Sequence, residues 1–179
     1  MKIRIPLLVS ALLISATVSV LTLQSASAAD LSDEQIERIK VNCVSIQGSL
    51  NQLYTTDKLL RVNRGQVYES IGTKLMNNFN ARLGNNSLDN KGLVTVATQY
   101  QTALTAFRDD YRSYEQQLSA TMAIDCKKNP TTFHASLEAS RTKRALVHGD
   151  VIKLNQYIDD YRSAVNDFML NFERVKERN

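Results

Sequence analysis

The feature that most constrains the fold is a regular spacing of three and four residues between apolar side chains in the last third of the chain. Its apolar members are Phe133, Leu137, Val147, Val151, Leu154, Ile158, Tyr161, Val165, Phe168, Phe172 and Val175. Only Ser140 and Arg144 interrupt the series. A repeat of about 3.5 residues, against about 3.6 per α-helical turn, keeps one seam of a helix facing a partner helix. The spacing therefore predicts a long helix with coiled-coil packing.

The N-terminal residues have the three-part composition of a secretory signal peptide. A charged start is followed by a mostly apolar stretch over residues 5–23 and then by small residues, among which Ala26 and Ala28 fit a cleavage site. We predict a helical signal peptide over residues 1–28, removed to leave a mature start at residue 29 or 30. An uncleaved anchor is the alternative, because the apolar stretch is close to the roughly 20 residues that span a bilayer.

The remaining chain, residues 29–179, has a length that suits one domain with its own core. Lys and Arg number 22 and Asp and Glu 18; without Lys2 and Arg4 the balance is 20 to 18, a net charge near +2. Nucleic-acid binding needs a concentrated basic face, so we expect no nucleic-acid partner. We expect membrane contact only if the signal segment is uncleaved.

Two cysteines, Cys43 and Cys126, occur in this chain. In an exported protein such a pair predicts a disulfide, with two buried free thiols as the alternative. Closing so long a loop would stabilise the fold by about 4.5 kcal/mol in the chain-entropy model. Regular helices would leave the two residues about 12 Å apart along the bundle axis, whereas bridged Cα atoms lie within about 7 Å. An irregular first helix or an extended loop at Cys126 would have to absorb the difference.

The first helix is expected over residues 32–83, since Ser32 and Gln35 form a capping box. Its expected seam is Ile36, Ile39, Cys43, Ile46, Leu50, Leu53, Asp57 and Leu60, then Val67, Ile71, Leu75 and Phe79. The spacing of four at the end predicts a shifted seam or a locally altered helix. Glycine weakens a helix, which makes Asn63-Arg64-Gly65 a candidate position for a kink and leaves open whether the helix is continuous through Gly65.

Two further helices are expected over residues 93–124 and 130–176. The seam of the former is Leu93, Val96, Tyr100, Leu104, Phe107, Tyr111, Tyr114 and Leu118. Turn-forming residues separate it from the first helix, and Pro130 suits the first turn of the last one. Because short loops between long helices make neighbours antiparallel, the sequence predicts an all-α, elongated, antiparallel three-helix bundle.

Four charged residues fall on or near the seam at similar heights and predict a polar layer at mid-bundle. They are Asp57, Arg64, Asp110 and Arg144. Paired charges in a core can fix helix register at a cost in stability, which is the structural interpretation. The functional alternative is a site for a small anionic ligand that uses the two arginines.

Catalytic motifs are not evident in the sequence. The two histidines, His134 and His148, would stand about 21 Å apart on one helix, so they cannot share a metal ion. No metal-binding, phosphate-loop or nucleophile–base spacing occurs. We therefore expect no enzyme, no metal and no cofactor.

The stretch from Leu60 to Glu69, LRVNRGQVYE, with Leu75-Met76 and residues 79–82 after it, resembles one in uncharacterised exported helical proteins of candidate-phylum (Saccharibacteria-type) bacteria. The resemblance implies a bacterial secreted or cell-surface setting and no particular activity. It also draws attention to Asn63-Arg64-Gly65.

Taken together, the sequence predicts an exported, non-enzymatic interaction or scaffold protein of the cell envelope, located in the periplasm, at the cell surface or outside the cell. The alternatives are a binding module for a small anion and a membrane-tethered spacer. We expect a protein partner whose identity the sequence does not give. Apolar residues outside the seam, such as Val41, Val44 and Leu59, also allow a homo-oligomer.

Overall fold

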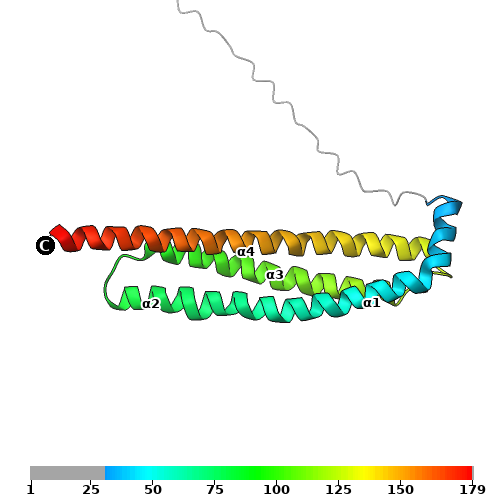
Figure 1. Cartoon of the computed structure of the whole chain (residues 1–179), viewed down its shortest axis with the longest axis horizontal. Helices are drawn as coiled ribbons and strands as arrows, with labels where there is room; N and C mark the ends of the chain where they lie inside the picture. Colours follow the sequence, from blue (N-terminus) through cyan, green and yellow to red (C-terminus); the bar gives the residue numbers. More distant parts are fainter. Residues whose placement is uncertain (1–30, 179) are drawn as a thin grey trace, which may run out of the picture. The chain divides into compact units, whose positions relative to one another are not determined.

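The computed structural model describes residues 31–178, so the predicted signal peptide over residues 1–28 lies outside the described part of the chain. These residues form a helical bundle (Figure 1). Its elements are α1 (Asp33–Ser70), the π-helix η1 (Ile71–Asn77), α2 (Asn78–Asn85), α3 (Lys91–Met122) and α4 (Pro130–Arg178). None of the described helices combines the length and apolar content that a membrane-spanning segment needs.

The helical stretches begin and end close to the predicted positions, but the first one, predicted as a single helix over residues 32–83, is divided into α1, η1 and α2. The capping box at the start of α1 is present: the backbone N–H of Gln35 donates to Ser32 Oγ, and the Ser32 N–H donates to the Gln35 side chain. At the start of α4, Pro130 occupies a first-turn position where its missing N–H costs no intrahelical bond. Local capping therefore fixes where α1 and α4 begin.

Helix α3 buries a continuous face against the other helices. Its buried residues are Leu93, Ala97, Tyr100, Ala103, Leu104, Phe107, Tyr111, Tyr114, Leu118 and Thr121. Every predicted seam position of this helix is among them except Val96, which is half-buried. Large aromatic side chains supply much of this face, and their burial is a main source of stability.

Two apolar clusters lie one after the other along α3. The first contains Tyr68, Met76, Leu83, Leu93, Ala97, Tyr100, Ala103, Leu104, Phe107, Leu154 and Tyr161. The second contains Cys43, Leu50, Tyr111, Tyr114, Leu118, Cys126 and Phe133. Val147 of α4 packs against both, so it marks the level at which they meet.

The irregular part of the first helical stretch lies at η1. The helix is continuous at Gly65, since α1 runs as α-helix through that residue to Ser70. A π-helix closes i→i+5 hydrogen bonds and has a wider turn than an α-helix. The wider turn brings residues four apart onto one face. The buried residues here are spaced in that way: Tyr68, Gly72, Met76 and Asn80.

The buried face also differs from the predicted seam, both in α1 before η1 and within η1 itself. Leu60, Val67 and Leu75 were expected in the core, but they are 46%, 56% and 60% exposed. Tyr68 and Met76, each one position further along the chain than Val67 and Leu75, are buried in their place. The spacing of four was therefore correctly linked to an altered helix, while the face assigned to the core was wrong.

Two buried tyrosine hydroxyls bind backbone carbonyls at η1 and its border. The Tyr100 hydroxyl of α3 donates to the Tyr68 carbonyl at 2.8 Å. The Tyr161 hydroxyl of α4 donates to Asn80 Oδ1 at 2.7 Å and lies 3.2 Å from the Met76 carbonyl. Burial raises the pKa of Tyr161 to about 12, so the hydroxyl stays protonated and able to donate at neutral pH. The other two helices therefore hold the irregular segment in place.

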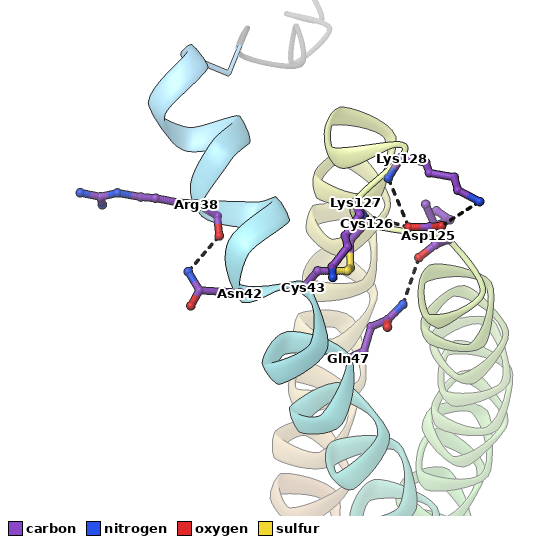
Figure 2. The surroundings of a disulfide bond; sticks show 9 residues. Arg38, Asn42, Cys43, Gln47, Asp125, Cys126, Lys127 and Lys128 are labelled. Carbon is purple, nitrogen blue, oxygen red and sulfur yellow. Dashed lines mark hydrogen bonds and ion pairs between the residues drawn. A yellow bond between two sulfur atoms is a disulfide. The ribbon is translucent and has the colours of Figure 1, made fainter.

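Figure 2 shows the disulfide that joins Cys43 of α1 to Cys126, which confirms the predicted pairing. The Cα atoms are 5.6 Å apart, within the range of bridged cysteines. Cys126 lies in the connection between α3 and α4, where the chain is not helical. The chain turns at Cys126, and the axial offset expected from two regular helices is absent. Nearby, the Gln47 side chain donates to the Ile124 carbonyl at 3.3 Å.

We predict that Tyr100→Phe and Tyr161→Phe each lower the free energy of unfolding by about 0.5–3 kcal/mol, because each removes a buried hydrogen bond between helical elements. Tyr157→Phe is the matched control: Tyr157 is only partly buried in the same cluster, and we expect a change within about 0.5 kcal/mol. Denaturant titration followed by circular dichroism measures all three. Equal stability of the Tyr100 and Tyr161 variants and wild type would contradict the role of the hydroxyls.

Candidate functional site: a basic groove between α1 and α4

A groove of about 540 Å³ lies between α1 and α4, with α3 as its floor. Three aromatic residues of α3 line the floor: Phe107, Tyr111 and Tyr114. The remaining lining residues are Asp57, Leu60, Arg61 and Arg64 of α1, and Arg141, Arg144, Ala145, Val147, His148 and Val151 of α4. Because Phe107 belongs to one apolar cluster and Tyr111 to the other, the groove lies where the two clusters meet.

Asp57 is the buried charge of this groove. Its carboxylate accepts a hydrogen bond from the Tyr114 hydroxyl at 2.7 Å. It also accepts from the Arg144 guanidinium, with Nε 3.1 Å from Oδ2 and Nη2 3.5 Å from Oδ1. Hydrogen bonding to Asp57 raises the pKa of Arg144 further. All three helices therefore contribute to one polar contact, in which a buried carboxylate is both paired and hydrogen-bonded.

The other three arginines that line the groove differ in whether an acidic side chain pairs with them. Arg61 Nη1 lies 2.7 Å from Glu115 Oε2, and its guanidinium carbon lies 5.1 Å from the centre of the Tyr111 ring, a cation–π distance. Arg141 is paired with Glu138 one turn earlier on α4. Arg64 is exposed and forms no ion pair with any residue in 31–178.

The charges of the groove leave one positive charge uncompensated. Four guanidiniums line it, and three carboxylates pair with them: Asp57, Glu115 and Glu138. The unpaired cation is Arg64. The groove thus combines an apolar and aromatic floor with a rim of net charge +1, counting His148 as neutral.

The predicted polar layer is brought together only in part. Asp57 and Arg144 form the ion pair at its centre, and Arg64 lines the same groove without touching either. Asp110 is not among the residues that line the groove. Arg61 and Arg141 also line the groove but were not predicted to belong to the polar layer. Their spacing could have indicated it, since they stand one helical turn from Asp57 and from Arg144, on the same faces.

Asp110 faces a second carboxylate instead. It lies beside Asp150 of α4, whose Oδ2 atom is buried and has no hydrogen-bond partner among the described residues. Burial, together with the repulsion and hydrogen bonding of Asp110, raises the pKa of Asp150, while Lys153 lowers it. Two carboxylates this close repel each other, which disfavours the charged form of Asp150.

The arrangement is suited to binding. No cluster of three or more potential metal ligands occurs within residues 31–178. Burial raises the pKa of Tyr111 to about 12 and raises that of Tyr114 as well, so neither hydroxyl loses its proton at neutral pH. A general base or nucleophile would need the opposite shift. The groove offers guanidinium donors and an aromatic surface, which recognise charge and shape.

Comparisons of the chain with protein-family models, with curated proteins and with solved structures find no match.

We predict that Arg144→Gln lowers the free energy of unfolding by about 1–3 kcal/mol, because it leaves the Asp57 carboxylate with only the Tyr114 hydroxyl. The control is Arg64→Gln, whose exposed side chain has no ion pair, so its effect should stay within about 0.5 kcal/mol. Chemical denaturation measures both. If the two variants lose the same stability, the Asp57–Arg144 pair is not a stabilising contact.

The raised pKa of Asp150 gives a second prediction, which concerns pH. A group whose pKa is higher in the folded than in the unfolded chain stabilises the fold fully below the unfolded pKa, about 3.9 for aspartate, and this contribution is lost as pH rises through the folded pKa. Asp150→Asn should therefore raise the melting temperature at pH 7 and reduce the loss of stability that wild type shows as pH rises from the unfolded pKa through the raised folded pKa.

The matched control for this titration is Asp160→Asn, which makes the same change in net charge at an exposed position of α4. Differential scanning calorimetry across the pH series follows both variants. If the melting temperature of Asp150→Asn varied with pH in the same way as that of wild type and the control, the Asp110–Asp150 pair would not be the source of this pH dependence.

Proposed function

We propose that this chain is an exported, non-enzymatic interaction protein of the cell envelope that binds its partner through the surface of a helical bundle. The observation that carries the proposal is the groove: an aromatic floor with four arginines around it, of which Arg64 is uncompensated. Pockets that combine an apolar lining with a few convergent polar groups are typical binding sites.

The disulfide supports the exported setting. Disulfides persist mainly in oxidising compartments outside the cytoplasm, and the Cys43–Cys126 bond fastens the first part of α1 to the α3–α4 connection. The signal-peptide composition of residues 1–28 points to the same location. Both observations agree with a secreted, periplasmic or cell-surface protein.

We further propose that the bundle is antiparallel with coiled-coil packing. Four contacts support this: as residue numbers rise along α1 and α2, the numbers of their partners on α3 and its two flanking connections fall. The pairs are Cys43 with Cys126, Asp57 with Tyr114, Tyr68 with Tyr100, and Asn80 with Asn90. Between α3 and α4, the pairs Asp110 with Asp150 and Thr121 with Ser136 also run in opposite orders. Spacings of three and four between the buried residues of α3 support coiled-coil packing.

A second candidate function is a scaffold that associates through apolar side chains outside the groove. Val41, Val44, Leu59 and Val62 of α1 are 46–71% exposed. Exposed apolar patches often mark surfaces for a protein partner or a second copy of the chain. α1 contributes residues both to this surface and to the groove. Substitutions at neighbouring positions of α1 can therefore show which of the two binds a partner.

The experiment uses two adjacent leucines of α1, both exposed, of which only Leu60 lines the groove. Wild type, Leu60→Glu and Leu59→Glu proteins are exported, cross-linked in the native envelope and recovered, and bound molecules are identified by mass spectrometry. N-terminal sequencing of the same samples tests cleavage after residue 28 or 29.

We expect a specific binder on wild type and Leu59→Glu that is lost from Leu60→Glu. The Leu60→Glu substitution puts a carboxylate on the groove wall, and a molecule bound in the groove would have to bury that charge. A binder lost only from Leu59→Glu would support the apolar scaffold surface instead. Recovery of the same molecules from all three proteins, or of none, would contradict a groove-based interaction.

A further inference from the structure

We propose that the groove between α1 and α4 binds a small amphiphilic monoanion: an organic molecule with an aromatic or hydrocarbon body and one carboxylate, phosphate-ester or sulfonate group. The inference rests on the proposed binding function and names the class of ligand. Its body would lie on the α3 floor, and its anionic group would face Arg64.

The size and lining of the groove fit such a molecule. Its volume of about 540 Å³ falls within the range of roughly 300–1,000 Å³ typical of small-molecule sites. The floor is formed by Phe107, Tyr111 and Tyr114, and Leu60 and Val151 add aliphatic surface from the two sides. Aromatic and aliphatic walls favour a flat or hydrocarbon body because they gain from removing apolar surface from water.

The charge of the ligand follows from the pairing of the arginines. Arg144 directs Nε and Nη2 at Asp57, and Arg61 is held by Glu115 and by the Tyr111 ring. Binding a polyanion through these two would mean breaking contacts that already satisfy them. Arg64 needs no such exchange, since it has no ion pair within the described chain. One available guanidinium matches one anionic group, and a cationic ligand would meet the net positive rim.

Because of its position, Arg64 can be substituted to test binding without lowering the stability of the fold. Its side chain is exposed, so its removal leaves no buried carboxylate without a partner. The Asp57–Arg144–Tyr114 contact holds the groove open at the junction of the two apolar clusters. A substitution at Arg64 therefore changes recognition while the site keeps its shape.

The test is a fluorescence titration with 8-anilinonaphthalene-1-sulfonate, which has one sulfonate on an aromatic body, on the disulfide-bonded mature protein. The neutral comparison probe is N-phenyl-1-naphthylamine, which has the same body without the anion. Inorganic phosphate supplies the anion without a body. Near-ultraviolet circular dichroism and cooperative unfolding confirm that every variant tested is folded, because loosely packed proteins also bind the sulfonate probe.

We expect wild type to bind one sulfonate probe per chain, and Arg64→Gln to weaken the affinity by roughly tenfold or more, the effect of losing a hydrogen bond to a charged group. The neutral probe should bind more weakly than the sulfonate and should be insensitive to this substitution. The matched control is Lys58→Gln, which removes an exposed α1 cation that does not line the groove and should leave the affinity unchanged.

Equal affinity of wild type and Arg64→Gln for the sulfonate probe would overturn the inference. So would equal affinity for the charged and neutral probes, or displacement of the probe by phosphate at similar concentration, which would show a simple anion site. If one of these probe results is obtained but an envelope binder is still lost from Leu60→Glu, the proposed groove-based function stands and only the ligand class is wrong. If, in addition, no envelope binder depends on Leu60, both the proposed function and the ligand class are wrong.

Discussion

The burial of one face of α3 is the constraint on which the rest of the structure depends. α3 carries most of the large buried aromatic side chains, and both apolar clusters are built on it. α1 and α4 are held in place chiefly by packing against this shared helix. Contacts between α1 and α4 themselves are few, among them the Asp57–Arg144 pair. The groove is a consequence, since two helices that pack on a third leave a hollow above it.

A charged contact at the level where two apolar clusters meet has an energetic cost and a structural use. Burying the Asp57 carboxylate without partners would be strongly unfavourable, and the Tyr114 hydroxyl and the Arg144 guanidinium offset this. The contact involves all three helices, so it also favours a single register between them. Asp57, Tyr114 and Arg144, which make this contact, are thus also among the residues that line the groove.

The sequence predicted the helices, the α3 seam and the disulfide, because each depends on local chemistry: spacing of apolar residues, capping groups and a cysteine pair. It misplaced the core face from Leu60 onward, because the local spacing does not reveal which face meets α3 and α4; at η1 that face receives tertiary hydrogen bonds from Tyr100 and Tyr161. Of the site, Asp57 and Arg144 could be paired by counting residues from the loops. Asp110 could not be placed, because which of two adjacent carboxylates meets Asp150 depends on the rotation of α3 against α4.

The central claim, that α3 is the shared core of the bundle, is tested most directly by hydrogen–deuterium exchange of backbone amides on the disulfide-bonded protein. The account predicts the slowest exchange in the middle of α3, around Tyr100–Tyr114, because its amides open only with global unfolding. Exchange should be faster in the first turns of α1 and near the exposed Phe172 of α4. If α3 exchanged as fast as these ends while α4 alone was protected, α3 would not be the element on which the fold depends.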